Sequence, residues 1–491
     1  MTPSPARTHL LAATIALAAV ALWSALSPPG ANDVAGGDEG YYGTMARNVL
    51  ADPRQLVSPS LSPLGPPGDK PPFYPALLAL AVRLLGPTAA ALRWPSLLFS
   101  GVVIWATAAL AMRAAGAWAG LAAAAFLACL PWFADSARVA NAEIPLTAFG
   151  MIALVLLAGG PVTARRALAA GAMLGLAFLC KLWLVALVAL PAVALLVPAP
   201  AGASPRESRR GLLLLIAGAA VVGALQLLAV AIVAPRDLGH WLSIYFRFSL
   251  ASRVGGEGFT PEWIRPPHYY LAALGRAFVL LLPLVAVGAW SAARRFREPA
   301  PRAILVGALG VVPLSLFRVK AGIYLFPIVP AWAMLAALGF AAVRAARPRV
   351  ALTLGLLAAA GGLAREVQRL PQRYHDPGYR EVAAALAPHV ADAPIARTSY
   401  LAPEAPAFDY YLFRTGRYWG TPIAPWSPDR LAAIAADTSL RAFIVDPAQR
   451  LYGGWPDSAT VAWLERDTRE VTGAIERDAG RRIEVRVFVR R

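Results

Sequence analysis

Apolar residues in this chain are gathered into long runs as far as about residue 364, and beyond that point polar and apolar residues mix as in a soluble protein. A helix needs ~20 mostly apolar residues to cross a bilayer. Eleven runs come close enough to this length to predict spanning helices. Their predicted limits are 9–27, 90–112, 117–134, 143–160, 164–180, 182–198, 211–234, 269–293, 302–318, 321–343 and 349–364. The pattern therefore predicts a polytopic α-helical membrane protein.

Residues 365–491 predict a soluble domain that follows the membrane body, residues 1–364. This stretch is long enough to bury a core of its own. Short strand-like runs at 441–446 and 481–489 alternate with helical patterns. Such alternation is typical of a small α/β domain.

A long loop, residues 28–89, follows the first predicted span and is assigned to the membrane body. It is rich in proline and glycine, but the run 73–85 (FYPALLALAVRLL) is apolar. This run is too short to cross a bilayer by itself. The sequence therefore predicts a short helix that lies at the membrane interface.

The charges in the loops predict how the chain is oriented. One alternate set of loops holds fourteen basic residues and two acids, Glu207 and Glu298. Its basic residues are Arg7, Arg113, Arg165, Arg166, Arg206, Arg209, Arg210, Arg294, Arg295, Arg297, Arg302, Arg344, Arg347 and Arg349. Loops rich in Lys and Arg stay in the cytoplasm. We therefore expect a cytoplasmic N-terminus and, after eleven spans, a C-terminal domain on the periplasmic side of a bacterial inner membrane.

The composition excludes two other classes of protein. The net charge is +18, but much of the basic excess lies in the short loops, and no basic block is interleaved with aromatics as in a nucleic-acid-binding protein. Cys129 and Cys180 lie within or at the end of apolar runs, and the five histidines are scattered. A metal site built from cysteine or histidine is therefore not expected.

The three lysines are candidates for binding phosphate. Lys70, Lys181 and Lys320 all lie at the predicted outer ends of membrane segments, whereas the other basic residues are arginine. An ammonium group acts as a compact point charge for phosphate. Ionisable groups near the membrane are often functional, although with three residues chance is the alternative.

Acidic residues accompany these lysines on the same predicted face. Asp38 and Glu39 follow the first span, and Arg138 and Glu143 flank the second outer loop. Each acid alone is typical of a helix cap or first turn. Together with the cations they predict a site in which a carboxylate deprotonates a hydroxyl and cations stabilise a leaving phosphate.

Two segments of the long loop resemble the first outer loop of the GT-C superfamily of glycosyltransferases. They are GGDEGYYGTMARNVL and GDKPPFYPALLAL. The most similar branches are the bacterial lipid A aminoarabinose transferases and the dolichyl-phosphate-mannose protein mannosyltransferase-like group, that is, glycosyltransferase families 39 and 83. The matching positions are Asp38, Glu39, Tyr42, Lys70, Pro71, Pro72 and Tyr74.

Three later segments continue the resemblance. SARVANAEIPLTAF is similar to the second loop, with Glu143 where the family usually has Asp. LAFLCKLWLVALVALP is similar to a Lys-Gly-Pro turn, with Leu182 and Trp183 in place of Gly-Pro. SLFRVKAGIYLFPIVPAWAMLAA is similar to the Lys…Tyr-x-x-Pro…Pro segment of the family. The matching positions there are Lys320, Tyr324, Pro327 and Pro330.

The resemblance implies a role for each candidate. Asp38 would act as general base or orient the acceptor with support from Glu39, and Glu143 would be the second acid. The residues expected at the donor phosphate are Lys70, Lys181, Lys320, Arg138 and Tyr324. Asp38 and Glu143 are also the expected ligands of a divalent cation, Mg²⁺ or Mn²⁺, if one is used.

These expectations describe an inverting glycosyltransferase. It would move a sugar from a polyprenyl-phosphate donor to a lipid such as lipid A, a polysaccharide or a protein on the periplasmic face. A transporter or flippase of lipid-linked sugars is the alternative, and a non-catalytic scaffold is another. A transporter is expected to show paired halves or broken helices, and the sequence has no duplicated half.

Overall fold

The computed structural model describes residues 4–30, 34, 38–57, 71–197, 204–243, 252–255, 264–373, 378–388, 395–397, 410–411, 432, 435–436, 438, 441–445 and 458–491. The chain forms two compact units. The first, here the membrane unit, comprises Met1–Pro28, Gly68–Tyr74 and Arg93–Pro371. The second unit comprises Pro29–Pro67, Pro75–Leu92 and Gln372–Arg491. The contacts therefore group most of the predicted loop 28–89 with the C-terminal residues.

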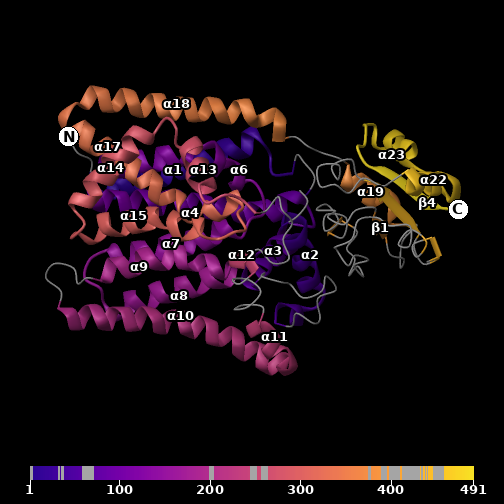
Figure 1. Cartoon of the computed structure of the whole chain (residues 1–491), viewed down its shortest axis with the longest axis horizontal. Coiled ribbons are helices and arrows are strands. Elements are labelled where there is room, and N and C mark those ends of the chain that lie inside the picture. Colours follow the sequence, from indigo (N-terminus) through magenta and orange to yellow (C-terminus); the bar gives the residue numbers. More distant parts are fainter. Residues whose placement is uncertain are drawn as a thin grey trace. The chain divides into compact units, whose positions relative to one another are not determined.

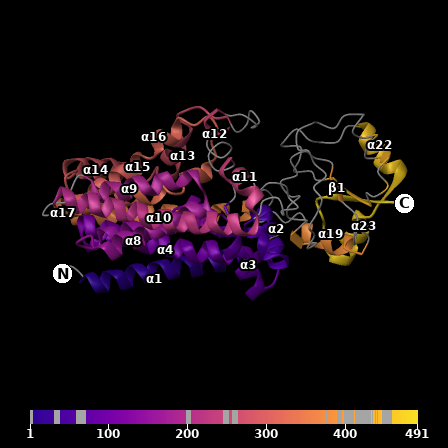
Figure 2. The same ribbon diagram turned by 90° about the horizontal axis from the view of Figure 1, so that it is seen from below.

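Long helices that run side by side build the membrane unit (Figures 1 and 2). Each of the eleven predicted runs is helical over most of its length. The helices are α1 (Pro5–Leu26), α4 (Ala89–Ala115), α5 (Ala117–Ala128), α6 (Pro131–Ala137), α7 (Glu143–Ala158), α8 (Ala164–Cys180), α9 (Ala186–Leu196), α10 (Pro205–Val233), α11 (Leu238–Ser243), α12 (Ser252–Gly255), α13 (Tyr269–Ala277), α14 (Leu282–Arg294), α15 (Pro299–Leu309), α16 (Val311–Ser315), α17 (Val329–Ala346) and α18 (Pro348–Arg373). Short 3-10 turns, Trp183–Val185, Pro235–Asp237 and Gly322–Leu325, connect some of them.

Five helices of the described chain, α1, α4, α10, α17 and α18, are long and apolar enough to cross a membrane. The number rises to seven if two bent pairs each count as one span: α5 with α6, bent by 67°, and α13 with α14, bent by 111°. Prolines explain the bends, because Pro131 opens α6 and Pro283 lies in the first turn of α14, where neither continues the preceding helix. The polytopic helical fold is confirmed, and the count of eleven spans stays a prediction.

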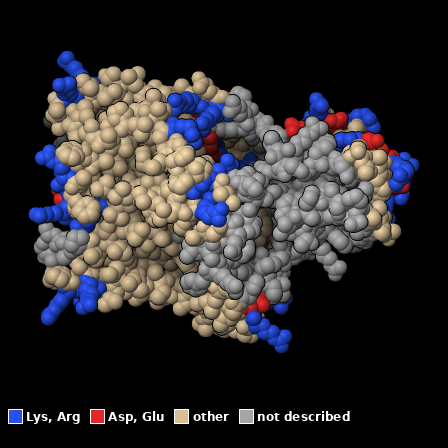
Figure 3. Space-filling model, in the orientation of Figure 1, with Lys and Arg blue, Asp and Glu red and all other residues tan. Residues whose placement is uncertain are grey.

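The charge on the surface of the membrane unit and the close packing of its helices both reflect its sequence. Figure 3 shows Lys and Arg side chains gathered at the end that holds the N-terminus, beside a broad surface without charge. Inside, glycines let helices approach closely: a β-carbon at Gly288 or Gly339 would collide with the backbone across α14 and α17. Small residues at helix contacts are typical of membrane bundles, where close backbone approach drives packing.

The second unit combines helices with one small sheet. Its strands are β1 (Ile395–Arg397), β2 (Ala442–Val445), β3 (Thr468–Glu470) and β4 (Arg486–Arg490), in the order β1-β2-β4-β3. β1 is parallel to β2, and the other neighbours are antiparallel. Its helices include α2 (Asp38–Ala51), α19 (Tyr379–Leu386), α22 (Ser458–Asp467), α23 (Thr472–Ala479) and the 3-10 turn Pro53–Leu56. The predicted combination of helices with a small sheet near the C-terminus is confirmed, and the predicted bounds of the domain, 365–491, stay a prediction.

One predicted helix has the expected limits, and another is longer than predicted. The interfacial run 73–85 forms α3 (Phe73–Leu85), as predicted. In contrast, α18 continues to Arg373, nine residues past the predicted end of the last span at 364. The sequence turns polar at Arg365, but polar residues with good helix propensity extend the helix beyond the apolar run.

Candidate active site

An ion pair is buried among the membrane helices. Glu143 is the first residue of α7, and Lys181 directly follows the last residue of α8. The Lys181 Nζ atom lies 2.8 Å from Glu143 Oε1, and the side chains are 2% and 1% exposed. Removing two charges from water carries a penalty that their attraction repays only when the geometry is good. Two residues predicted to serve the site are thus brought together.

Tyr324 completes this group. It lies in the turn Gly322–Leu325, and the centroid of its ring is 5.7 Å from the Lys181 Nζ atom. Tyr324 is itself 6% exposed. An ammonium over an aromatic face is attracted to the ring's negative quadrupole. Lys181 therefore has an anion and an aromatic ring that stabilise its buried charge.

Lys320 lies nearby in the chain but binds backbone instead. Its ammonium donates to the carbonyl oxygen of Arg265, 3.0 Å away, and to that of Phe317. The bridge between Ile264 and Val319 holds the same two segments together. Since an ammonium has three N–H donors, these contacts account for two of them. The predicted contact of Lys320 with a phosphate stays a prediction.

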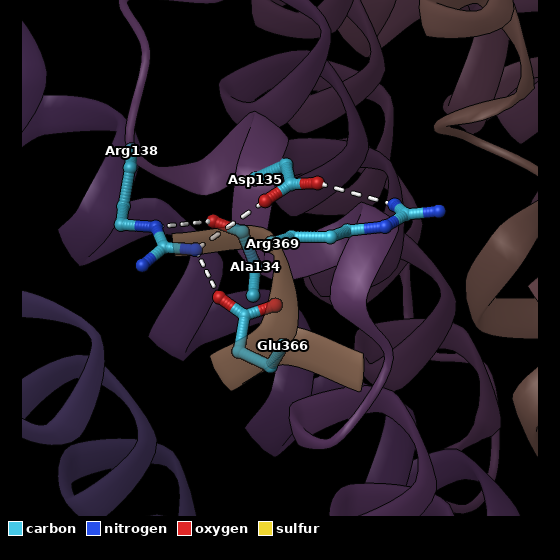
Figure 4. A network of polar contacts seen from close by, with 5 residues as sticks. All are labelled: Ala134, Asp135, Arg138, Glu366 and Arg369. Atoms are coloured by element: carbon cyan, nitrogen blue, oxygen red, sulfur yellow. Dashed lines mark hydrogen bonds and ion pairs between the residues drawn. The ribbon is translucent and has the colours of Figure 1, made fainter. Parts of the chain in front are cut away.

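Arg138 takes part in a network of ion pairs (Figure 4). Its guanidinium donates to the carbonyl oxygen of Ala134 at 3.1 Å and to Asp135 Oδ1 at 3.3 Å, and it pairs with Glu366. Arg369 NH1 lies 3.5 Å from Asp135 Oδ2. The network joins α6 to α18. An anion that binds Arg138 must therefore compete with carboxylates already present.

The sequence analysis missed the acidic members of this network. Asp135 follows an apolar run, and Glu366 lies beyond the predicted end of the last span. The signal available was the charge spacing on α18, where Glu366 stands three residues before Arg369 on the same helix face. Nothing in the pattern connects Glu366 with Arg138, which is 228 residues away.

Asp38 and Glu39 form the first turn of α2 in the second unit. Acids in a first turn interact favourably with the positive end of the helix dipole. Glu39 is 1% exposed and Asp38 is partly buried. The meeting of these acids with Glu143 and the lysines stays a prediction, because they belong to different units, and Lys70 lies outside the described residues.

Tyr410 and Tyr411 hold α2 from the C-terminal part of the second unit. The guanidinium carbon of Arg47 lies 5.6 Å from the Tyr410 ring centroid, and Arg47 also donates to the Tyr410 carbonyl. The Tyr410 hydroxyl donates to the Thr88 carbonyl at 2.9 Å, and the Val34 amide donates to the Tyr411 hydroxyl at 2.9 Å. Tyr410 is completely buried. The helix that begins with Asp38 is thus fixed by residues more than 350 positions away.

No group of three or more His, Cys, Asp or Glu side chains that could hold a metal occurs in the described part of the chain. The expected cation between Asp38 and Glu143 therefore stays a prediction. Lys181 already lies against Glu143 Oε1. A divalent cation at that carboxylate would have to share it with the ammonium, and the two positive charges would repel each other.

The architecture has two parts. The membrane unit consists of side-by-side helices with charged groups buried at helix ends, and the second unit contains a small sheet. The predicted resemblance to the GT-C superfamily of glycosyltransferases is confirmed at the level of the fold by the solved structures that this chain resembles. Residues 69–232 match the sequence model of the dolichyl-phosphate-mannose-protein mannosyltransferase family. No curated protein sequence matches the chain.

Solved structures give the likeness in detail. The chain superimposes on ArnT from Cupriavidus metallidurans in the apo state with a TM-score of 0.66 at 17% identity over 97% of both chains. The same protein bound to undecaprenyl phosphate gives 0.62 at 16% identity over 97% of both chains. The archaeal oligosaccharyltransferase AglB from Archaeoglobus fulgidus, in complex with an inhibitory peptide and a dolichol-phosphate, gives 0.59 at 16% identity over 90% of this chain and 70% of that one.

Proposed function

We propose that the chain is an inverting glycosyltransferase that moves a sugar from a polyprenyl-phosphate donor to a lipid, polysaccharide or protein acceptor on the periplasmic face of a bacterial inner membrane. The observation that carries the proposal is the buried group of Glu143, Lys181 and Tyr324 in a chain with the GT-C fold. A paired ammonium at the end of a membrane helix is the kind of ionisable group that is retained for function.

The donor class is supported by the ligands of the solved structures. ArnT from Cupriavidus metallidurans binds undecaprenyl phosphate, and AglB from Archaeoglobus fulgidus is in complex with a dolichol-phosphate. Both are phosphates on long isoprenoid chains. The apolar helices of the membrane unit suit such a chain, because its tail can pass from the bilayer to apolar side chains without exposure to water.

The proposed reaction is a single displacement. The acceptor hydroxyl oxygen forms a bond to the anomeric carbon while the bond from that carbon to the phosphate oxygen breaks. The electron pair leaves with the polyprenyl phosphate, and the hydroxyl proton passes to Asp38 as general base. Attack from the face opposite the phosphate inverts the anomeric configuration. Glu39 would orient Asp38.

The negative charge that develops on the departing phosphate needs cations. Lys181 is held by Glu143 and by the face of Tyr324, so its ammonium is already placed and desolvated before any donor arrives. Preorganised charge of this kind lowers the barrier strongly in many enzymes, because it requires no reorganisation during the reaction. Lys70 and Lys320 are the further proposed phosphate contacts. Arg138 is another proposed phosphate contact, and a phosphate there would compete with the carboxylates of Asp135 and Glu366.

Mass spectrometry of glycolipids and glycoproteins tests the proposal. Cells with the wild-type chain should contain a glycosylated lipid, polysaccharide or protein that is missing in a deletion strain and in Asp38→Asn cells with normal protein levels. Sugar-loaded polyprenyl phosphate should accumulate in both mutants. Identical glycan profiles in the wild type and the deletion strain would refute the transferase.

A flippase for lipid-linked sugars remains the second candidate, because a specific observation favours it. Two spans of the described chain are bent, by 67° and 111°, and broken helices are a feature of transporters. Proteoliposomes distinguish the two functions. A flippase would move a labelled polyprenyl-phosphate sugar between leaflets without an acceptor, whereas the transferase would consume the donor only when an acceptor is present.

A further inference from the structure

The membrane unit contains a cavity of about 270 Å³ that the proposed reaction does not use. It lies where α6, α13 and α18 meet, beside both bent pairs of helices. Trp132 and Tyr269 form aromatic walls, and Arg276, Arg365 and Arg369 reach it from α13 and α18. None of the described residues that line it is acidic. The cavity is therefore a concave basic site.

The positive charge of this cavity is poorly balanced by the protein. Arg369 has one carboxylate contact, with Asp135 at 3.5 Å, and its side chain is 51% exposed. Arg276 and Arg365 form no ion pair with any acid that the structure describes. Three guanidinium groups around one hollow repel each other, and low-dielectric walls strengthen the field there. An anion would relieve this repulsion.

The side chains favour phosphate among the possible anions. A guanidinium presents parallel N–H donors that match two phosphate oxygens, and it binds them with two charge-assisted hydrogen bonds. Arg365 and Arg369 are four residues apart, so they project from the same face of α18. Arg276 approaches from α13. Side chains of α13 and α18 thus bring cations to the same cavity.

Apolar crevices continue from the basic cavity. A smaller hollow shares Pro131, Ala277 and Arg365 with it and is otherwise largely apolar. That hollow shares Cys129 with a groove of about 230 Å³ between α1, α5 and α18. Leu22, Trp23 and Leu363 line the groove, and its acid, Glu366, is paired with Arg138.

The outer surface of α18 is also apolar. Leu352, Leu356, Leu357 and Leu363 are each at least 40% exposed. On a helix that is long and apolar enough to span, such side chains face lipid. Arg365 and Arg369 follow directly where this apolar surface ends, which is the level of lipid headgroups. A basic cavity at that level, joined to an apolar groove, matches a molecule with an anionic head and an acyl tail.

We propose that the cavity at Arg276, Arg365 and Arg369, here the arginine pocket, binds the phosphate headgroup of an anionic bilayer lipid. One acyl chain of this lipid lies along the groove between α1, α5 and α18. Glu143, Lys181 and Tyr324 do not line the arginine pocket, although Gly322 and Leu325, from the turn that carries Tyr324, do. The inference does not depend on glycosyl transfer, and it holds or fails whether or not the proposed reaction occurs.

Native mass spectrometry of the purified full chain tests the proposal. The protein is titrated with phosphatidylglycerol, with zwitterionic phosphatidylethanolamine, with a polyprenyl phosphate and with inorganic phosphate. Phosphatidylglycerol should bind at least tenfold more tightly than phosphatidylethanolamine. The triple variant Arg276→Gln/Arg365→Gln/Arg369→Gln should lose at least tenfold in affinity for phosphatidylglycerol. The control is Arg349→Gln, the same type of substitution on α18 at an exposed residue outside the pocket. It removes one charge where the triple variant removes three, and it should bind as the wild type does.

A second variant keeps the test valid if the triple variant misfolds. Leu363→Trp narrows the groove and leaves all three arginines in place, so it should weaken phosphatidylglycerol binding and spare the binding of inorganic phosphate. Unchanged affinity in both variants would overturn the proposal. So would equal losses in Arg349→Gln, displacement of phosphatidylglycerol by equimolar inorganic phosphate, or a preference of the pocket for polyprenyl phosphate over phosphatidylglycerol.

Discussion

The Nζ atom of Lys181 lies 2.8 Å from Glu143 Oε1, and neither side chain is more than 2% exposed. The two residues are 38 positions apart, at the start of α7 and just beyond the end of α8. Each carries a charge that the other offsets in the buried interior. The pair therefore stabilises the membrane unit, and it also holds the ammonium that we propose to contact the donor phosphate.

Glu143→Gln should destabilise the membrane unit strongly, because it removes the carboxylate that faces the buried Lys181 ammonium. Breaking one half of a buried pair costs about 3–5 kcal/mol. Thermal unfolding of the detergent-solubilised protein measures this. The double variant Glu143→Gln/Lys181→Met should recover much of the lost stability, since it removes both charges. A single variant as stable as the wild type would contradict the ion pair.

Substitutions at Tyr324 separate the ring from its hydroxyl. Tyr324→Phe keeps an aromatic face toward Lys181, whereas Tyr324→Leu removes it. We expect Tyr324→Leu to be less stable than Tyr324→Phe by about 0.5–2 kcal/mol, the usual range for a cation–π contact. This difference in stability between Tyr324→Leu and Tyr324→Phe should disappear in a Lys181→Met background. If the difference persists there, it reflects packing of the ring and not its contact with the ammonium.

The pair between Arg138 and Glu366 should tie α6 to α18. In a double-mutant cycle with Arg138→Gln and Glu366→Gln, we expect a coupling free energy of about 0.5–3 kcal/mol, as for other contacting charges. The exposed pair of Arg295 and Glu298 is a control within the same protein. Glu298→Gln should change the stability by less than ~1 kcal/mol. Additive effects of the two buried substitutions would show that the network does not link the helices.

Tyr410 should determine how firmly α2 is held in the second unit. Tyr410→Phe removes the hydrogen bond to Thr88, at about 0.5–1.5 kcal/mol, whereas Tyr410→Ala removes a fully buried ring, at about 3–5 kcal/mol. Gly43→Ala should act in the same direction, because a β-carbon there would press on the Tyr410 ring. Hydrogen exchange of the amides in α2 measures the effect. Equal protection of α2 in wild type and Tyr410→Ala would rule out this role.

Lys70→Ala and Asp38→Asn should separate donor binding from chemistry. We expect Lys70→Ala to weaken polyprenyl-phosphate binding, because it removes a proposed charge contact. Asp38→Asn should leave binding unchanged and lower the transfer rate by about 10²–10⁴-fold, the usual contribution of a general base. Donor titrations and single-turnover assays with purified protein distinguish the two. Full transfer activity in Asp38→Asn would assign the base elsewhere.

Local patterns allowed the helices to be predicted because each depends on residues close in sequence. The run 73–85 became α3 with the same limits. Ser204 and Glu207 form the capping box that begins α10, a signal readable within four residues. At Pro131 and Pro283 the run predicted one span and the structure has a bent pair, whereas α4 and α9 continue through Pro95 and Pro191.

Contacts between distant residues were not predictable in this way. The pairing of Lys181 with Glu143 depends on how α7 and α8 pack, and hydrophobicity alone does not determine which polar residues then face each other. The partner of Arg138 lies 228 residues away, and the partner of Arg47 lies 363 residues away. The family resemblance named Glu143, Lys181 and Tyr324 as candidates, but it gave no indication of Glu366, Tyr410 or the arginine pocket.

The second unit is assembled from three stretches of chain, Pro29–Pro67, Pro75–Leu92 and Gln372–Arg491. Residues from distant parts of the sequence therefore share one hydrogen-bonded structure. A chimera that replaces the tail alone with that of a relative would separate Arg47 and Thr88 from Tyr410. The loop and the tail therefore have to be exchanged together for these contacts to be kept.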